Sequence, residues 1–251
     1  MTFKFVTADE TGVIYAVTSS GDLLFYRDLA RDGTVNWAND GTAKAIGAGW
    51  GNFAKLFCGG DGTIYAVTAG GELLFYKDLG RDGTTHWAND GTAKTIGSGW
   101  GAFTHLFSGG KGVVYAVTAG GELLFYKDLA RDGTVDWANE GTPKTIGAGW
   151  GAFTHLLSGG DGVIYAVTAG GDLLFYRDLA GDGSVNWANE GTAKTIGSGW
   201  GSFSHLFSGG DGVLYAITPA GDLLFYQDRA RDGTIDWAND GAGQPIGSGW
   251  L

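Results

Sequence analysis

Residues 101–150 read GAFTHLFSGG KGVVYAVTAG GELLFYKDLA RDGTVDWANE GTPKTIGAGW. This segment contains four short apolar stretches, separated by glycine-containing turns: Phe103–Ser108, Val113–Thr118, Leu123–Asp128 and Pro143–Gly147. The first three are rich in aromatic and β-branched residues, which suit a pleated sheet, and glycine tolerates the positive φ angles of tight turns. We predict four β-strands and no helix, because the longest glycine-free run, Glu122–Asp132, lacks a capped apolar stripe at helical spacing.

The same segment recurs along the whole chain with a period of fifty residues. Residues 51–100 and 101–150 differ at 13 positions, so 37 of 50 are identical. Tryptophan marks the end of every copy, at Trp50, Trp100, Trp150, Trp200 and Trp250. We therefore divide the 251 residues into five repeats, 1–50, 51–100, 101–150, 151–200 and 201–251, which form one domain.

The strand sequences indicate how the repeats pack. Val113–Val117 and Leu123–Tyr126 carry apolar side chains on both faces, whereas a sheet with one wet face alternates apolar and polar residues. Four-stranded sheets covered on both sides predict an all-β, five-bladed β-propeller of four-stranded antiparallel blades. The chain then begins with a first strand, Phe3–Ala8, and ends with a fourth, Pro245–Trp250. No strand is exchanged in this arrangement, and the ring closes by packing of blade faces alone.

Composition narrows the range of partners. Glycine makes up 48 of 251 residues, but without the three-residue period of collagen. The net charge of −11 disfavours nucleic acid and anionic membranes as partners. A single cysteine, Cys58, forms no internal disulfide, and no apolar run approaches the ~18 residues of a membrane span. No signal peptide is visible, so localisation stays open between the cytoplasm and release by a non-signal route, and the oligomeric state is not readable.

The Asp, His and Cys residues of this sequence do not follow the pattern of a metal site or a catalytic site. Asp28 and Asp32 do not match the spacing of a calcium loop, and a turn held by an Asp side chain explains them better than a metal does. Histidine at one repeat position, His105, is replaced by Phe5 in the first copy, which favours a structural role. Cys58 replaces a serine and is expected to be a small buried residue. We predict no catalytic residue, no metal and no cofactor, hence no enzyme.

A polar, aromatic loop in every repeat is the candidate binding segment. Tryptophan offers a flat apolar face, asparagine offers a donor and an acceptor, and a carboxylate accepts paired hydrogen bonds. This combination suits a shallow site for a neutral sugar, although such a tryptophan can also serve only for packing. The candidate carbohydrate-binding residues are Trp37, Asn39, Asp40, Trp87, Asn89, Asp90, Trp137, Asn139, Glu140, Trp187, Asn189, Glu190, Trp237, Asn239 and Asp240.

The spacing of aromatic residues and glycines resembles the tachylectin-2 type of five-bladed propeller lectin. The matching residues are Gly97–Phe103, Tyr115–Val117, Phe125–Lys127, Trp137 and Ile146–Trp150, and the resemblance covers essentially the whole chain. It implies one five-bladed ring with one site per blade for an N-acetylhexosamine, either N-acetylglucosamine or N-acetylgalactosamine. It also implies that these sites lie near the interfaces of adjacent blades.

The leading functional hypothesis is a multivalent, non-catalytic lectin for glycans that carry N-acetylated hexosamines. Several weak sites on one ring would gain avidity on a glycosylated surface. Two alternatives stay open. One is a propeller that docks a protein partner on one face, and the other is an engineered or recently duplicated scaffold without a selected ligand.

Overall fold

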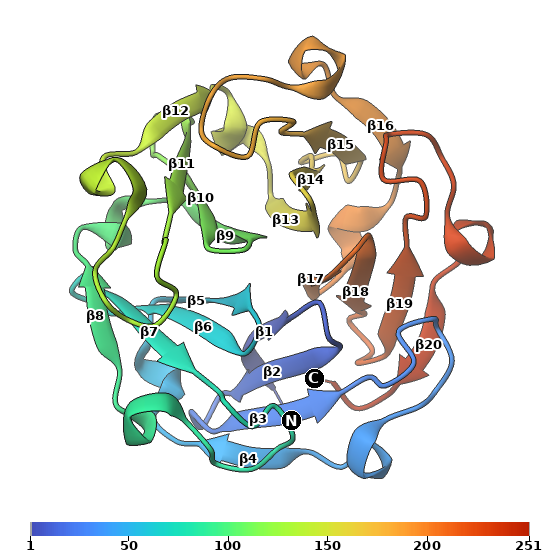
Figure 1. The fold of residues 1–251 in the computed structure, drawn as a ribbon. Coiled ribbons are helices and arrows are strands. Elements are labelled where there is room, and N and C mark those ends of the chain that lie inside the picture. The colour runs from blue at the N-terminus through green and yellow to red at the C-terminus, as the bar shows by residue number, and fades with distance from the viewer. Residues whose placement is uncertain (1, 251) are drawn as a thin grey trace.

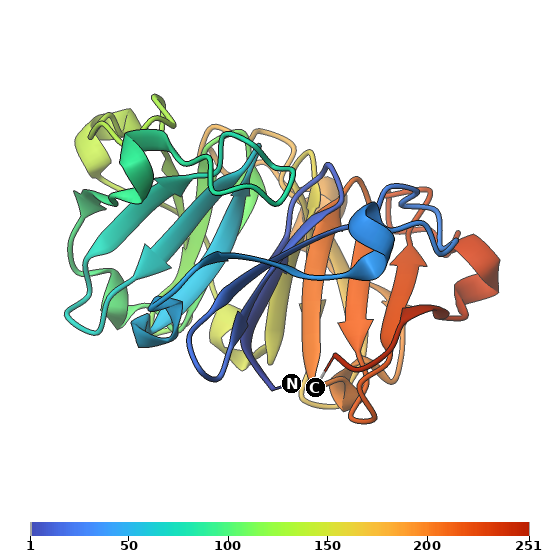
Figure 2. The same ribbon diagram turned by 90° about the horizontal axis from the view of Figure 1, so that it is seen from below.

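The computed structural model describes residues 2–250 as a ring of five four-stranded antiparallel sheets, one from each repeat (Figure 1). Within each sheet the strands follow chain order, and β1, β5, β9, β13 and β17 face the centre. Seen from the side, the ring is a flattened cylinder (Figure 2), and Phe3 at the start of the first blade packs on Trp250 of the fifth. The predicted all-β, five-bladed propeller with fifty-residue repeats is confirmed.

The elements repeat with nearly constant bounds. The strands are β1 (Phe3–Ala8), β2 (Val13–Thr18), β3 (Leu23–Arg27), β4 (Lys44–Gly47), β5 (Lys55–Gly60), β6 (Thr63–Val67), β7 (Leu73–Lys77), β8 (Lys94–Gly97), β9 (His105–Gly110), β10 (Val113–Val117), β11 (Leu123–Lys127), β12 (Lys144–Gly147), β13 (His155–Gly160), β14 (Val163–Val167), β15 (Leu173–Arg177), β16 (Lys194–Gly197), β17 (His205–Gly210), β18 (Val213–Ile217), β19 (Leu223–Gln227) and β20 (Gln244–Gly247). Short 3₁₀ turns connect them: η1 (Ala38–Gly41), η2 (Trp50–Asn52), η3 (Ala88–Gly91), η4 (Trp100–Ala102), η5 (Ala138–Gly141), η6 (Trp150–Ala152), η7 (Ala188–Gly191), η8 (Trp200–Ser202) and η9 (Ala238–Gly241).

The strand predictions hold to within a few residues. The first strand has the predicted bounds, Phe3–Ala8, while the last strand ends at Gly247 rather than at Trp250. The reason lies in the glycines that follow each fourth strand. Gly249 has a φ of 79°, and this left-handed residue turns the chain out of the sheet so that Trp250 packs on the next blade. None of the helices within residues 2–250 is long and apolar enough to cross a membrane.

The core consists of five separate clusters, one at each junction between blades. At the junction of the second and third blades, Tyr65, Phe75 and Trp100 pack with Val114 of the next blade. Because both faces of every blade are covered in this way, the central strands β2, β6, β10, β14 and β18 carry buried side chains almost throughout. This explains the two-sided apolar pattern of the sequence.

Buried hydrogen bonds cross every junction. The hydroxyl group of Tyr15 donates to the carboxylate of Asp78 in the second blade at 2.9 Å, and both side chains are almost fully buried. The same bond joins Tyr65 to Asp128 at 2.9 Å, Tyr115 to Asp178 at 3.1 Å, Tyr165 to Asp228 at 2.8 Å and Tyr215 to Asp28 at 2.9 Å. The five bonds form a closed circuit, because the last one returns from the fifth blade to the first.

The ring closes without an exchanged strand, but blade faces are not the only contact. A long loop of the first blade, residues 28–37, reaches over the fifth blade. A Cβ at Gly33 would collide with Gln244, and the indole N–H of Trp37 donates to the carbonyl of Ile246 at 2.8 Å. Trp250 packs on Phe3 and Tyr26 from the other side. The ring is therefore closed by the contacts of this loop with the fifth blade, in addition to the predicted packing of blade faces.

Candidate functional site

A pocket of about 270 Å³ opens between the third and fourth blades. The third blade contributes the end of β12 and the turn after it, and the fourth blade contributes aromatic residues from β15 and the loop that follows. The lining residues are Ile146, Gly147, Ala148, Gly149, Trp150, Phe153, Tyr176, Val185, Trp187 and Gly191. The site is thus apolar and aromatic on its walls, with glycine backbone along one side.

Glycines set the position of Trp150 at this pocket. Gly149 precedes η6 with a φ of 85°, a left-handed conformation that side chains other than glycine rarely adopt. The backbone N–H of Trp150 then donates to the carbonyl of Gly121 at 2.9 Å, which fixes the turn to the β10–β11 hairpin. The indole ring packs on Tyr176 and Trp187 of the fourth blade, with ring centroids 4.8 and 5.6 Å away.

The two tryptophans of the pocket differ in their polar atoms. The indole N–H of Trp187 donates to the carbonyl of Ile146 at 2.8 Å and is therefore committed to the junction. Within residues 2–250, neither the indole N–H of Trp150 nor the hydroxyl group of Tyr176 has a hydrogen-bond partner, and neither atom is fully buried. Partial burial raises the pKa of Tyr176, so its hydroxyl group stays protonated at neutral pH. A ligand therefore meets two free hydrogen-bonding groups between aromatic walls.

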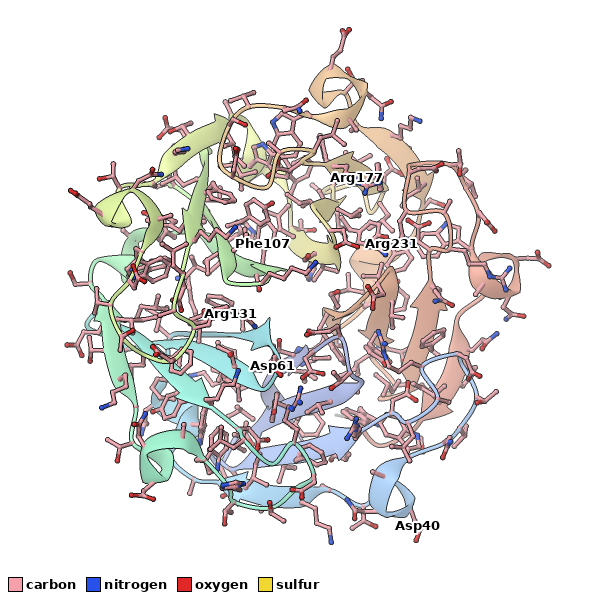
Figure 3. The ribbon with its side chains drawn as sticks, viewed as in Figure 1. Asp40, Asp61, Phe107, Arg131, Arg177 and Arg231 are labelled. Atoms are coloured by element: carbon pink, nitrogen blue, oxygen red, sulfur yellow. The ribbon has the colours of Figure 1, made fainter. Side chains whose placement is uncertain are left out.

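The predicted asparagine and acidic residues lie on the loop beyond the pocket. Asn189 and Glu190 form part of η7, are exposed, and have positive φ angles of 53° and 55°. Asp40, the equivalent of Glu190 in the first blade, lies at the outer edge of the ring (Figure 3). The structure thus brings Trp187 and the neighbouring Gly191 into the pocket, while Asn189 and Glu190 do not line it.

The aromatic cluster of this pocket recurs at the other junctions. Trp50 packs on Tyr76 and Trp87 with centroid distances of 4.5 and 5.7 Å, and Trp250 packs on Tyr26 and Trp37 at 4.5 and 6.0 Å. The remaining clusters are formed by Trp100 with Tyr126 and Trp137, and by Trp200 with Tyr226 and Trp237. The second blade differs at the rim, where Thr85 stands at the position of Val185.

Sequence reasoning missed three contributors to the pocket. Tyr176 sits in an apolar strand, so its hydroxyl group gave no separate signal. Trp150 entered the sequence analysis as a marker of the repeat, yet its N–H has no partner within residues 2–250. Val185 is 69 % exposed although it is apolar, and its position beside Trp187 becomes visible only in the folded chain.

The two aspartates considered as metal ligands accept hydrogen bonds from nearby backbone N–H groups instead. Asp28 is buried and accepts hydrogen bonds from the backbone N–H groups of Ala30 and Arg31, besides that from Tyr215. Asp32 accepts from the N–H and hydroxyl of Thr34, which lowers its pKa. No group of three or more His, Cys, Asp or Glu side chains in the described part of the chain is placed to hold a metal ion.

The histidines of the inner strands and the single cysteine also occupy packed positions within the blades. His105, His155 and His205 begin the inner strands β9, β13 and β17, and burial lowers the pKa of each ring. Cys58 is buried as predicted, its thiol donates to the carbonyl of Thr63, and burial raises its pKa. A thiol held protonated in this way is a poor nucleophile.

Comparison with known proteins agrees with the five-bladed ring of the structure. The model of the Tachylectin family matches residues 1–81 and 72–251. The chain belongs to the Tachylectin family. This tachylectin is therefore a lectin-type five-bladed propeller, although family membership leaves its sugar unspecified. A search of curated proteins gives no match.

Several solved structures are similar to this chain. A structure from work on the de novo evolutionary emergence of a symmetrical protein is 28% identical, with a TM-score of 0.63, and the match covers 95% of this chain and 94% of the other. A 6-phosphogluconolactonase from Bacteroides uniformis is 13% identical, with a TM-score of 0.49 and coverage of 97% and 72%. The WD40 domain of SCAP from fission yeast is 9% identical, with a TM-score of 0.45 and coverage of 94% and 55%.

Proposed function

We propose that this tachylectin is a multivalent, non-catalytic lectin that binds N-acetylated hexosamines, N-acetylglucosamine or N-acetylgalactosamine, at the junctions between its blades. The observation that carries the proposal is the junction pocket, in which aromatic walls surround two hydrogen-bonding groups that have no partner in the described part of the chain. A sugar presents an apolar C–H face and vicinal hydroxyl groups, and both find complementary surfaces here. Family membership supports the same function.

The roles of the residues follow from their positions in the pocket. Trp187 offers a ring face, because its N–H is already bonded to Ile146. Trp150 and Tyr176 offer a donor and a hydroxyl group, and the backbone of Gly147–Gly149 offers amide and carbonyl groups for the acetamido substituent. The loop residues Asn189 and Glu190 are proposed to contact parts of a glycan that extend beyond the pocket.

Multivalency follows from the repetition of the aromatic cluster. Each junction holds the same tryptophan–tyrosine–tryptophan arrangement, so up to one site per blade is proposed. A shallow single site gives weak binding, but simultaneous contacts with one glycosylated surface raise avidity by a factor on the order of 10²–10⁴. Thr85 at the rim of the second blade makes that site differ from the others.

A glycan array with monosaccharide competition tests the proposal. Glycans with terminal N-acetylhexosamine are expected to bind, and free N-acetylglucosamine or N-acetylgalactosamine is expected to compete. Uniform signals across all glycans, or competition by unrelated sugars only, would contradict the proposal. Titration calorimetry on Tyr176→Phe, which removes one hydroxyl group from one junction, is expected to show about one site weakened while the others bind as before.

Docking of a protein partner is a second candidate, favoured by exposed apolar side chains. Leu29, Leu79, Leu129 and Leu179 are each about half exposed, and Val35, Val135, Val185 and Ile235 are more exposed still. These side chains belong to the long loops that follow the third strands. A glycan array without selective signals, combined with capture of one defined protein through these residues, would favour this candidate over the lectin.

A further inference from the structure

The central channel departs from the five-fold pattern of the junctions. A cavity of about 680 Å³ runs along the inner strands and reaches several of the β-turns between the first and second strands, with Lys111, Asp161 and Asp211 in its lining. At the tip of these turns the five blades carry Thr11, Asp61, Lys111, Asp161 and Asp211. The turn tip is therefore acidic in three blades, neutral in the first and basic in the third.

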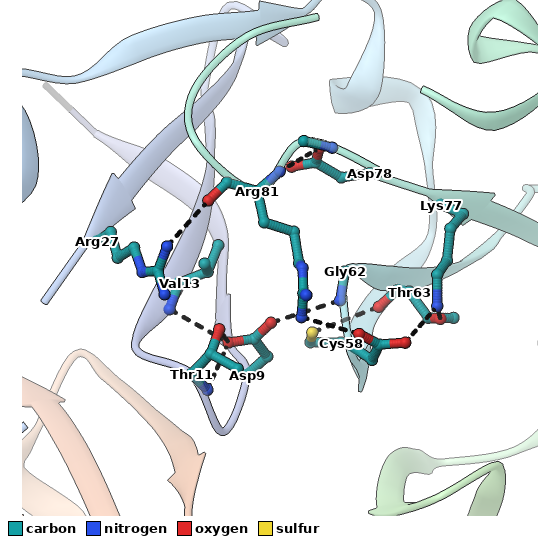
Figure 4. A network of polar contacts seen from close by, with 12 residues as sticks. Asp9, Thr11, Val13, Arg27, Cys58, Gly62, Thr63, Lys77, Asp78 and Arg81 are labelled. Carbon is teal, nitrogen blue, oxygen red and sulfur yellow. Dashed lines mark hydrogen bonds and ion pairs between the residues drawn. The ribbon is translucent and has the colours of Figure 1, made fainter. Parts of the chain in front are cut away.

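The second blade shows how a turn carboxylate is held there. Lys77 and Arg81 converge on the carboxylate of Asp61, with N–O distances of 2.9 and 2.8 Å (Figure 4). The hydrogen bond from Lys77 and the positive charges of Lys77, Arg81 and Arg131 lower the pKa of Asp61. Lys77, Arg81 and the Asp61 carboxylate thus form a local cluster in which the anion offsets one of the two contacting cations.

The third blade repeats this cluster without its anion. Lys127 and Arg131 occupy the positions of Lys77 and Arg81, but Lys111 replaces the aspartate. The backbone is equivalent, because Lys127 pairs with Val113 as Lys77 pairs with Thr63, and Lys111 has the φ of its counterpart, 51° against 52°. Three cations therefore stand where the second blade has two cations and a carboxylate.

Two of these cations have no acceptor for their terminal nitrogens within residues 2–250. The side chains of Lys127 and Arg131 form neither an ion pair nor a hydrogen bond there, and Nε of Arg131 is buried without a partner, as it is in the equivalent arginines of the first and fifth blades. The other arginines at this repeat position are engaged: Arg31 donates to the carbonyl of Gly209 at 2.8 Å, and Arg231 donates to Asp161 at 3.0 Å. Figure 3 shows Arg131 and Arg231 beside the central opening.

The carboxylates near the third blade are each held more closely by other groups. Asp61, whose pKa the charge of Arg131 helps to lower, is in contact with two cations of its own blade. Lys111 lies 3.5 Å from Asp161, but its side chain is 86% exposed, and Asp161 is held more closely by Arg231. Asp128, next to Lys127 in sequence, is buried and accepts from the hydroxyl group of Tyr65 and the backbone N–H of Arg131. Lys111 and Lys127 line the central cavity, so the positive charge of these two side chains faces it.

The fourth blade leaves room at the same place. In the other four blades an arginine follows the third strand, and Arg31 and Arg231 reach to the turn of the preceding blade. The fourth blade has Gly181 instead, and a Cβ there would meet no atom within 4 Å. Gly181 lines the channel together with Lys111 and Lys127, so the space beside these two cations is open.

We propose that the turn of the third blade binds one multiply charged oxyanion, a phosphate or a sulfate, either free or as a monoester. The anion takes the place that the Asp61 carboxylate has in the second blade, between Lys111, Lys127 and Arg131. Guanidinium and ammonium groups form short charge-assisted hydrogen bonds to such oxygens. The organic part of a monoester would extend into the open channel beside Gly181. This site is separate from the junction pockets and does not depend on the lectin function.

Titration calorimetry with inorganic phosphate, inorganic sulfate and methyl phosphate tests the proposal at constant ionic strength. The decisive variant is Lys111→Asp, which recreates the cluster of the second blade and so preserves the fold. We expect one binding site in the unmodified protein and at least about a tenfold loss of affinity in this variant. Comparison of the inorganic anions with methyl phosphate shows whether the site takes free anions only or esters as well.

Two further variants separate this site from general electrostatics. Lys44→Asp makes the same change of charge on the outer strand β4 and is expected to leave the affinity within about twofold. Gly181→Arg fills the open space and is expected to weaken binding of methyl phosphate more than that of phosphate. The proposal is overturned if the unmodified protein shows no saturable binding, or if Lys111→Asp binds as well as Lys44→Asp does. Thermal melting without anion is expected to show that Lys111→Asp folds like the unmodified protein, because the second blade holds an aspartate at this turn against the equivalent lysine.

Discussion

The junctions between blades and the mouth of the central channel follow different rules. At the junctions, the tyrosine–aspartate bond and the cluster of two tryptophans and a tyrosine recur in all five blades. At the channel mouth, the turn tip carries aspartate in three blades, threonine in one and lysine in one. The difference teaches that side chains which join blades must fit both neighbours, whereas turn tips face solvent and tolerate a change of charge.

The largest effect is expected from removing a junction tryptophan. Trp150 is buried against Tyr176 and Trp187, so Trp150→Ala leaves a cavity that the blades cannot fill. We expect a loss of about 3–5 kcal/mol in the free energy of unfolding, measured by chemical denaturation. A turn-tip variant, Asp211→Thr, copies the residue of the first blade and serves as the control, with an expected change below about 0.5 kcal/mol. Equal losses in the two variants would remove the distinction between the regions.

The buried hydroxyl groups of the junctions are expected to have the next largest effect. Tyr115→Phe leaves Oδ2 of the buried Asp178 carboxylate without its donor, which is expected to cost about 1–3 kcal/mol. Tyr176→Phe removes a hydroxyl group that has no partner within residues 2–250, and its stability is expected to change by less than about 0.5 kcal/mol. Denaturation curves of both variants measure the difference, and a cost at Tyr176 as large as that at Tyr115 would contradict it.

The closing junction is a stricter case of the same comparison. Tyr215 bonds to Asp28 across the only junction whose two blades are not consecutive in sequence. Since the geometry equals that of the other four, Tyr215→Phe is expected to cost as much as Tyr115→Phe, again about 1–3 kcal/mol. A negligible cost would show that the ring opens easily between the first and fifth blades, and limited proteolysis would then locate the opening.

A smaller effect is expected from pH at the other end of the channel. Burial lowers the pKa of His105, His155 and His205 in the folded protein, so the unfolded chain binds protons more readily. The stability that these neutral rings contribute is present above the unfolded pKa of about 6.5 and is lost as pH falls toward the folded values. Melting temperature should therefore decrease between about pH 7 and 5. His155→Phe, which copies Phe5 of the first blade, should flatten this decrease, and an unchanged slope would exclude the histidine as its cause.

The fold is readable from the sequence because its two signals are local. The fifty-residue period gives the number of blades, and the apolar residues on both faces of Val113–Val117 give the packing of each blade against two neighbours. The bonds across junctions are not readable in this way. Tyr15 and Asp78 are 63 positions apart, and Trp87 bonds to Ile46 from 41 positions away. A periodic sequence offers the same partner types in every blade and does not say which blade supplies them.

The candidate site is readable only in part for a related reason. Sequence pointed to Trp187 through its polar neighbours, but the hydroxyl group of Tyr176 and the free N–H of Trp150 belong to residues that look like core. Whether a polar atom is satisfied depends on its neighbours in the folded chain. The channel mouth differs from the candidate site in this respect. The sequence shows that Lys111 and Gly181 depart from the repeat, but only the structure shows that both line the same cavity.

A crystal structure of this tachylectin soaked with N-acetylglucosamine tests the central claim most directly. The proposal predicts sugar density at the blade junctions, with the ring against Trp187 and polar contacts to Tyr176 and Trp150, and equivalent density at other junctions. Saturating sugar with every junction empty, or with density confined to the central channel, would contradict it.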